Sequence, residues 1–386
     1  MSYTLRDYQT EASEKALDSF RRGERNGLLV LPAGGGKSLI IAEIASRLDS
    51  PLLVFCPSKE ILEQNYHKYL SYGFMDCSIY SASIGKKEIS KVTFATIGSV
   101  HNHIQDFDCF KYVIVDEAHN VSSEGGMYKE FIDAKPRVVV GLTATPYRLS
   151  SYGPGCSVLK FLTWTRPRVF TEVLYCCQVK YLMDNGYLCK PNYYDVTSID
   201  ISRVKLNSTG ADYDERSLKE EYTRSEYYTK LTNLVIRLLH PKSGVPRKGI
   251  LVFTRFVEEA RYLANVIPDC AIVTADTPKK ERERIIEEFR AGKIKVVSNV
   301  NCLSVGFDYP ELDTILMARP TKSLAVYYQC YGRVIRPAQG KDAWIVDMCG
   351  NLSRFGKLED LEVIEYPNKR NWCVMSNGKQ LTNVVL

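Results

Sequence analysis

A glycine-rich segment followed by Lys37 and Ser38 has the residue types that bind nucleotide phosphates. It reads Leu31-Pro32-Ala33-Gly34-Gly35-Gly36-Lys37-Ser38 and lies between an apolar run, 27–31, and an apolar helical pattern, 39–45. Glycines let backbone N–H groups turn toward phosphate oxygens, and the start of a helix adds donors and a positive dipole end. Lys37 would bind the outer phosphates, and the Ser38 hydroxyl would bind magnesium. Leu31 stands where the strict G-x-x-x-x-G-K-[ST] pattern has its first glycine.

Two adjacent carboxylates, Asp116 and Glu117, follow the apolar run 112–115. The carboxyl end of a buried strand is where ligands bind in open α/β sheets. Asp116 would hold magnesium, and Glu117 would orient and activate an attacking water. Most Asp-Glu pairs are solvated surface, so this interpretation depends on the phosphate loop in the same half of the chain. His119 is either a hydrogen-bonding strand-end residue or a residue that couples the site to its surroundings.

Two other expected strand ends carry polar residues that would lie on the same edge. Ser58 and Lys59 follow the run 52–56, and Thr143 and Thr145 follow the run 137–141. Each is ordinary turn chemistry in isolation. Together they place hydroxyls and a lysine beside the predicted phosphate site.

The second half offers a counter-charge in Gln329, Arg333 and Arg336, which lie at i, i+4 and i+7. The spacing predicts one face of a helix that is stopped by Pro337. Two arginines on one face could bind a phosphate bidentately, although a solvated basic face is the common alternative. A nucleotide held by Lys37 and by these arginines would close a cleft, and hydrolysis would reopen it.

The elements that must position these residues show as short apolar runs that alternate with helical patterns. Such runs are typical of parallel sheets covered on both faces, and the pattern occurs twice. We expect an α/β protein with domains at 1–190 and 246–360, a connecting segment at 191–245 and a tail at 361–386. The runs are 27–31, 52–56, 92–95, 112–115 and 137–141, then 250–253, 271–273, 294–297, 314–317 and 344–346.

Composition excludes several classes of protein. The 386 residues suffice for two or three domains, and 45% hydrophobic with 25% charged residues is an ordinary globular balance. The net charge of +6 permits a polyanionic partner without requiring one. None of the 12 cysteines forms a C-x-x-C pair, which favours reduced thiols over a zinc site. No signal segment and no apolar run of about 20 residues is present. A soluble, cytoplasmic protein without membrane contact is expected.

Taken together, these motifs resemble those of the superfamily 2 helicases, in the order that the family has them. The resemblance covers about residues 3–350 and implies two tandem RecA-like domains, each a mostly parallel sheet with helices on both faces. The matching segments are 5–9 (the Q motif), 31–38 (motif I), 58–59 (motif Ia), 95–96, 116–119 (a DEAH box), 143–145 (motif III), 253–255 (motif IV), 304–308 (motif V) and 329–336 (motif VI).

The resemblance also implies roles for individual residues. Arg6 and Gln9 would recognise adenine, and Gly306 and Asp308 of motif V would join the nucleotide site. Arg333 and Arg336 would act as arginine fingers. The expected catalytic set is Lys37, Asp116, Glu117, Gln329, Arg333 and Arg336; the coupling set is His119, Thr143 and Thr145; the nucleic-acid contacts are Ser58, Lys59, Thr96, Arg255 and Thr274.

Within the superfamily the chain looks most like the RadD group of bacterial DNA-repair helicases, without the zinc module of its longer members. The resemblance implies an ATP- and Mg²⁺-dependent translocase or helicase on single-stranded or branched DNA, in repair or recombination. It would be a bacterial or phage-encoded monomer with a possible accessory repair protein. The alternatives are an RNA helicase, the motor subunit of a restriction or defence complex, and a binding module that does not hydrolyse ATP.

Overall fold

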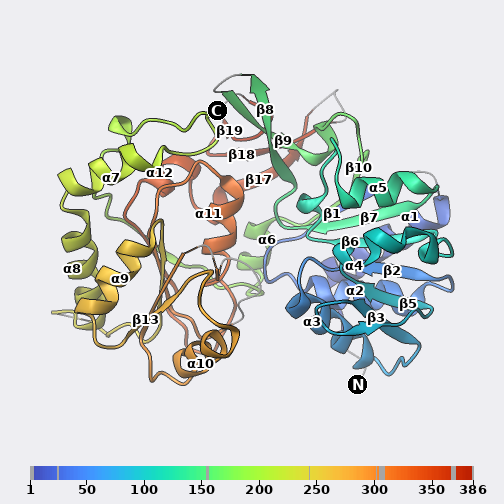
Figure 1. The fold of residues 1–386 in the computed structure, drawn as a ribbon, viewed down its shortest axis with the longest axis horizontal. Helices are drawn as coiled ribbons and strands as arrows, with labels where there is room; N and C mark the ends of the chain where they lie inside the picture. Colours follow the sequence, from blue (N-terminus) through green and yellow to red (C-terminus); the bar gives the residue numbers. More distant parts are fainter. Residues whose placement is uncertain are drawn as a thin grey trace. The chain divides into compact units, whose positions relative to one another are not determined.

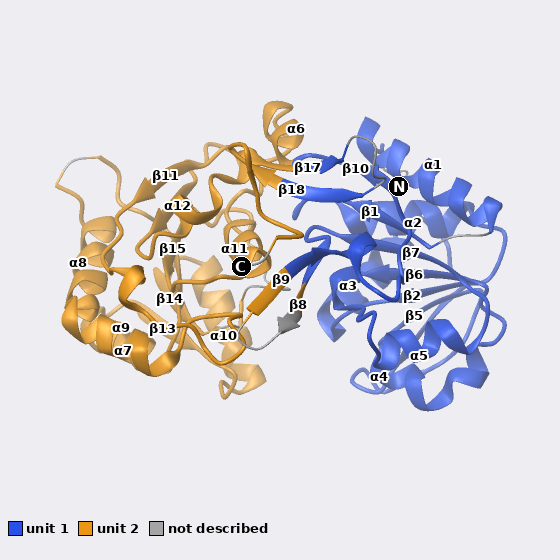
Figure 2. Cartoon of the chain, turned by 90° about the horizontal axis from the view of Figure 1, so that it is seen from above, with its two compact units in different colours: residues 1–148, 159–178, 363–374 blue, residues 149–158, 179–362, 375–386 orange. Residues whose placement is uncertain are grey.

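The computed structural model describes residues 4–23, 26–153, 156–242, 244–300, 302–303, 309–366 and 371–384 (Figure 1). The chain forms two compact units, which Figure 2 shows in different colours. The first unit contains Met1–Arg148, Leu159–Gln178 and Val363–Val374; the second contains Leu149–Val158, Val179–Glu362 and Met375–Leu386.

The first unit is built on an eight-stranded sheet in the order β10-β1-β7-β6-β2-β5-β3-β4. All neighbours pair in parallel except β3 and β4. The central strands are buried along their whole length, which is why they read as continuous apolar runs. The strands are β1 (Gly27–Val30), β2 (Leu52–Phe55), β3 (Cys77–Ser81), β4 (Lys86–Lys87), β5 (Val92–Ala95), β6 (Tyr112–Asp116), β7 (Val138–Thr143) and β10 (Glu172–Cys176).

The helices of the first unit pack in two groups against this sheet. The first group contains α1 (Asp7–Arg22), α2 (Lys37–Arg47) and α3 (Lys59–Leu70), which contact one another in sequence. The second contains α4 (Ile97–Val100), the 3₁₀ segment η1 (His101–Phe107) and α5 (Met127–Ala134). Helix α2 follows β1 in the chain, and α3 follows β2, so both helices begin near the carboxyl ends of parallel strands.

The second unit is built on a six-stranded sheet in the order β11-β16-β15-β12-β14-β13, and all its pairs are parallel. All ten apolar runs predicted as strands are strands in the two sheets, so the expected α/β class is confirmed. The strands of this sheet are β11 (Asn192–Asp195), β12 (Ile250–Thr254), β13 (Cys270–Val273), β14 (Val296–Asn299), β15 (Thr314–Ala318) and β16 (Trp344–Asp347).

One face of the second sheet is covered by α7 (Glu215–Arg224), α8 (Tyr227–Leu239) and α9 (Val257–Val266). Alternate residues of β12, Ile250 and Val252, share a buried apolar cluster with Leu231 and Val235 of α8. The segment 191–245 therefore lies within the second unit and contributes to its core. The remaining helices are α6 (Val179–Asp184), α10 (Lys279–Arg290), α11 (Leu324–Tyr331) and α12 (Asn351–Phe355).

Two smaller sheets complete the described fold. β8 (Tyr147–Gly153) pairs with β9 (Cys156–Phe161), and β17 (Leu361–Glu365), β18 (Trp372–Ser376) and β19 (Lys379–Gln380) form a three-stranded sheet. No helix among the described residues combines the length and the apolar character that a bilayer crossing requires.

Candidate functional site

The glycine-rich sequence predicted to bind phosphate forms a tight loop between β1 and α2. Gly34 and Gly36 have φ values of 79° and 75°, a conformation that favours glycine. A Cβ on Gly36 would also lie 2.3 Å from the Gln9 side-chain nitrogen, so the loop has no space for a larger residue there. Leu31 extends the strand: its N–H donates to the Thr143 carbonyl at 3.0 Å, and its side chain is fully buried. This explains why the position needs no glycine.

Residues before and at the start of α1 hold the phosphate loop. The Tyr8 hydroxyl donates to the Gly35 carbonyl at 2.9 Å, and the Gln9 amide donates to the same carbonyl at 3.3 Å. The Gln9 side-chain oxygen accepts from the Arg6 N–H at 3.0 Å, which caps the helix. The predicted adenine-reading residues thus stand next to the phosphate loop, and Gln9 is 2% exposed. Tyr8 was not among the predicted site residues.

The two carboxylates stand at the end of β6, beside the same loop. The Asp116 Oδ1 atom accepts from the Glu117 N–H at 2.9 Å, and Oδ2 accepts from the Asn65 side-chain amide at 3.0 Å. Glu117 has a positive φ of 53°, which turns its side chain off the strand direction. Its Oε1 atom forms an ion pair with Lys37, and the two side chains are 18% and 14% exposed. The structure therefore joins the predicted lysine and the predicted carboxylates in one cluster.

Burial sets the electrostatics of Asp116. Desolvation raises the pKa of its carboxyl group, whereas the charge of Lys37 and the hydrogen bond from Asn65 act in the opposite direction. The Asn65 side-chain oxygen is buried without a hydrogen-bond partner among the described residues. A cation is the partner that a desolvated carboxylate favours.

The oxygen atoms of Asp116 and Ser38 are of the type that binds Mg²⁺. Among the described residues no cluster of three or more His, Cys, Asp or Glu side chains could hold a metal ion alone. Magnesium commonly uses one or two protein oxygens together with substrate phosphates. The Asp116 carboxylate at the end of β6 and the Ser38 hydroxyl in the first turn of α2 would supply those oxygens.

A hydrogen-bonded group links this cluster to the end of β7. The His119 Nδ1 atom lies 3.1 Å from the Thr143 hydroxyl, 3.0 Å from the Thr145 hydroxyl and 3.4 Å from Glu117 Oε2. Burial lowers the pKa of His119, so the neutral ring is favoured. Arg148 donates to the His119 carbonyl at 3.2 Å. All three residues predicted for coupling are therefore brought together, and Arg148 is an additional member.

The predicted nucleic-acid contacts of the first unit lie at the ends of neighbouring strands. Ser58 follows β2 and caps α3, its hydroxyl accepting from the Ile61 N–H at 3.4 Å. Lys59 is the first residue of α3. Thr96 follows β5, and its hydroxyl oxygen lies 2.9 Å from that of Ser99. Because β6, β2 and β5 are neighbours, these side chains share the sheet edge that carries Asp116.

The segment that contains Arg333 and Arg336 does not have the predicted helical structure. Helix α11 ends at Tyr331 and not at Pro337, so Gln329, Arg333 and Arg336 do not share a continuous helical face. After Tyr331 the chain makes a tighter turn, in which the Arg333 N–H donates to the Cys330 carbonyl at 3.2 Å. A proline disfavours the helical conformation of the residue before it. The burial of Val334 and Ile335 also draws the chain into the core, and burial lowers the pKa of Arg336.

The other predicted residues of the second unit lie at strand ends. Arg255 follows β12 and pairs with Asp212 at 2.9 Å. Thr274 follows β13, and its N–H donates to the Thr277 hydroxyl at 2.9 Å. Gly306 and Asp308, with the rest of motif V, lie outside the described residues.

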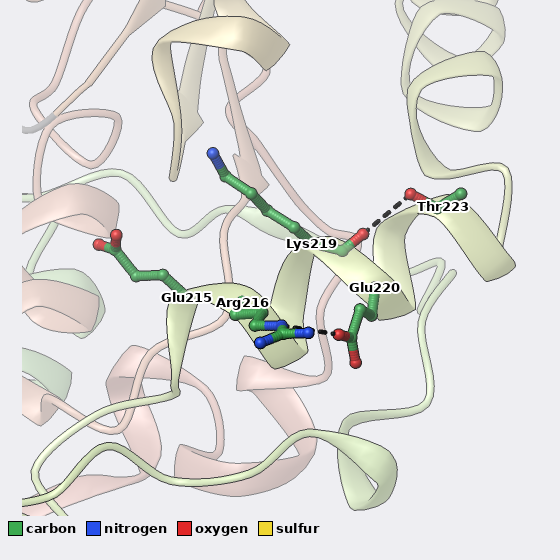
Figure 3. A pocket seen from close by; sticks show the side chains of 5 residues that line it. All are labelled: Glu215, Arg216, Lys219, Glu220 and Thr223. Carbon is green, nitrogen blue, oxygen red and sulfur yellow. Dashed lines mark hydrogen bonds and ion pairs between the residues drawn. The ribbon is translucent and has the colours of Figure 1, made fainter.

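A hollow lies on the surface of α7, and its lining includes Glu215, which also pairs with Arg255. Figure 3 shows its five lining side chains, Glu215, Arg216, Lys219, Glu220 and Thr223. Arg216 donates to Glu220 at 3.3 Å within the hollow. Its mixed charges and its exposure do not resemble a phosphate site.

Two protein families match the chain, one in each half. Residues 2–148 match the family described as "Type III restriction enzyme, res subunit". Residues 230–338 match "Helicase conserved C-terminal domain". The first match contains the phosphate loop and the carboxylates, and the second contains Gln329, Arg333 and Arg336.

Individual relatives are similar over most of this chain. The "51.5 kDa protein" of a Lactococcus phage is 28% identical over an alignment of 334 residues, and the match covers 84% of this chain and 66% of that protein. The "DNA 3'-5' translocase XPB2" of Sulfurisphaera tokodaii is 24% identical over an alignment of 374 residues, and the match covers 89% of this chain and 81% of that protein. The chain spans about half the length of two other curated relatives.

Among solved structures, the "ATP-dependent Type ISP restriction-modification enzyme LlaBIII bound to DNA" has a TM-score of 0.66 at 17% identity. The likeness covers 90% of this chain and 28% of that one, and it confirms the tandem α/β fold. The chain therefore matches two families in tandem, the restriction-enzyme subunit family over residues 2–148 and the helicase C-terminal family over residues 230–338.

Proposed function

We propose that this protein is an ATP-dependent DNA translocase or helicase. The observation that carries the proposal is the cluster of Lys37, Glu117 and Asp116 beside a glycine loop at the carboxyl edge of a parallel sheet. Phosphate loop, metal-binding carboxylate and general base are the parts that hydrolysis of a nucleoside triphosphate requires. The relatives named as helicases and translocases support the same activity.

Each residue of the cluster has a defined task. Lys37 and the N–H groups of residues 34–36 would bind phosphate oxygens, and Ser38 and Asp116 would hold the magnesium ion. Bound Mg²⁺ would neutralise phosphate charge. Lys37 cannot keep its Glu117 partner and bind a phosphate fully at the same time. Exchange of this ion pair frees the Glu117 carboxylate, which then accepts a proton from the attacking water.

Residues of the second unit would also take part in hydrolysis. Arg333 and Arg336 would stabilise negative charge on the transferred phosphoryl group, and Gln329 would help to position it. The hydrogen-bonded group of His119, Thr143 and Thr145 would transmit the loss of the Lys37 ion pair at Glu117. It would transmit it to the edge of the sheet that carries Ser58, Lys59 and Thr96. Movement of the two units would then be linked to the state of the nucleotide.

DNA is the substrate that the comparisons favour. The archaeal relative is named for DNA translocation, and the LlaBIII structure contains DNA. A role in repair or recombination, and a closer place in the RadD group, rest on the sequence resemblance alone. The match of residues 2–148 to a restriction-enzyme subunit favours a second candidate, the motor of a restriction or defence complex.

The experiment that tests the proposal is steady-state ATP hydrolysis with single-stranded DNA, duplex DNA, forked DNA and RNA. We expect DNA to stimulate hydrolysis more than RNA. Lys37→Ala should abolish turnover while leaving DNA binding largely intact, because Lys37 serves the phosphates. Unchanged turnover in Lys37→Ala would refute the assignment of the phosphate loop, and stimulation by RNA alone would favour an RNA helicase.

A further inference from the structure

The segment 206–213 of the second unit, which we call the 206–213 hairpin, is closed on itself. Leu206 and Tyr213 form an antiparallel bridge, and the Asn207 N–H donates to the Asp212 carbonyl at 2.9 Å. The Asn207 side-chain oxygen accepts from the Ala211 N–H at 3.1 Å. The hairpin is therefore a defined element that is held together by its own hydrogen bonds.

The hairpin supplies the acid that neutralises Arg255. The Arg255 Nη1 atom lies 2.9 Å from Asp212 Oδ2, and Nη2 lies 3.5 Å from Glu215 Oε1, at the start of α7. The Arg255 and Asp212 side chains are only 16% and 22% exposed. Glu215 also lines the hollow of Figure 3, so the second acid borders solvent.

Two further basic side chains hold the same hairpin. Lys322 Nζ donates to the Gly210 carbonyl at 3.3 Å, and Arg354 donates to the Tyr213 hydroxyl. Arg255 follows β12, Lys322 follows β15, and Arg354 lies in α12 after β16. Because β16, β15 and β12 are neighbours, the hairpin lies against a row of basic residues at the carboxyl edge of the sheet.

The pair between Asp212 and Arg255 is suited to exchange. Asp212 Oδ1 is buried and has no hydrogen-bond partner among the described residues, so the carboxylate binds Arg255 through one oxygen only. A buried acceptor without a partner carries a free-energy cost that release would remove. A phosphate offers a guanidinium the same paired-oxygen geometry as a carboxylate.

We propose that the 206–213 hairpin competes with nucleic-acid phosphates for Arg255, with Asp212 in the position that a backbone phosphate would take. The inference rests on the proposed function, because it assumes that nucleic acid reaches Arg255. Binding of a strand then requires the Asp212 ion pair to open, which makes the hairpin an internal brake on nucleic-acid affinity. Lys322 and Arg354 keep the hairpin in place until the exchange occurs.

The test is Asp212→Asn, which keeps the side-chain shape and removes the competing charge. Affinity for fluorescein-labelled oligodeoxythymidine, measured by anisotropy, should rise about tenfold at low salt, as loss of a charge-assisted competitor allows. Glu226→Gln is the matched control, since it changes the net charge equally at an exposed position outside the hairpin.

Arg255→Ala in the Asp212→Asn background separates the specific effect from general electrostatics. We expect the gain in affinity to disappear in this double variant. If Asp212→Asn binds no better than the parent, or if Glu226→Gln gains as much, the inference is wrong while the proposed function stands. A parent protein that neither binds the oligonucleotide nor hydrolyses ATP would overturn the proposed function, and the inference with it.

Discussion

The buried carboxyl group of Glu259 makes the stability of this protein depend on pH. Glu259 lies in the first turn of α9, and its Oε2 atom accepts from the backbone N–H of Arg255 at 3.0 Å. Its Oε1 atom is buried without a hydrogen-bond partner among the described residues. Burial raises the pKa of Glu259 from 4.5 to about 8, although the two backbone donors and the charge of Arg319 oppose the rise. The perturbation that tests this is Glu259→Gln.

The free energy of unfolding should decrease as the pH rises, because folding raises the pKa of Glu259. The folded-state pKa lies above the unfolded value, so the contribution to stability is fully present below about pH 4.5 and is lost as the pH rises toward 8. A pKa difference of about 3.5 corresponds, at 1.36 kcal/mol for each unit, to about 5 kcal/mol in total, of which about 3 kcal/mol or slightly more is lost between pH 5 and pH 8. Glutamine keeps an acceptor oxygen for the backbone donors but does not ionise.

The assay is urea unfolding of the full chain, followed by circular dichroism at several pH values between 5 and 8. The free energy of unfolding of the parent should fall relative to that of Glu259→Gln by about 3 kcal/mol over this range. The difference between the two proteins removes the contributions of Asp116 and Asp347, whose pKa values burial also raises. A parent-minus-variant difference that stays constant with pH would refute the reasoning.

Two further predictions concern the catalytic site. Asn65→Ala removes the donor to Asp116 Oδ2; because a hydrogen bond to a charged group is worth about 1.5–3 kcal/mol, half-maximal ATP hydrolysis should need at least about tenfold more Mg²⁺. An unchanged magnesium titration would exclude this role of Asn65. Arg336→Ala should leave ATP binding near normal and slow hydrolysis by roughly 10³–10⁵, as loss of an arginine finger does in other systems. Normal turnover in a single-cycle measurement would contradict the role of Arg336 as an arginine finger.

The central strands could be predicted because burial on both faces leaves a direct mark on the sequence. β2 and β12 are apolar throughout, and each lies between two parallel neighbours. The strands that were not predicted lie toward the edges of the sheets. β11 carries Asn192 and Asp195, and β3 buries Ser78 through a hydrogen bond to the Glu88 carbonyl. Seen in the sequence alone, strand residues whose polar groups are hydrogen-bonded in this way look the same as the polar residues of a loop.

The helix expected at 327–336 failed for a physical reason. Its spacing of polar residues fits a helix, but spacing does not report that Val334 and Ile335 are fully buried. The Ile335 carbonyl accepts from the Cys189 N–H at 2.7 Å, a contact between segments far apart in the sequence. Tertiary contacts therefore override the local pattern after Tyr331.

The candidate site shows the same division between local and long-range information. Lys37, Asp116 and Glu117 were identified because each belongs to a short motif with its own chemistry. Asn65 belongs to none, and only the folding of the chain brings its amide from α3 to Asp116 at the end of β6. Arg148 likewise reaches the His119 carbonyl through the path of the chain after β7. Positioning residues of this kind become visible only in the folded chain.

Glu117→Gln tests the central claim most directly, because it removes only the proposed general base. Binding of a fluorescent ATP analogue and DNA-stimulated hydrolysis should be measured on the same preparation, with Glu226→Gln as a control for the change in charge. The account predicts near-parental or tighter ATP binding, since Lys37 loses a competing partner, together with hydrolysis slowed at least about a hundredfold. Hydrolysis at the parental rate would contradict the assignment of Glu117 and, with it, the proposed motor.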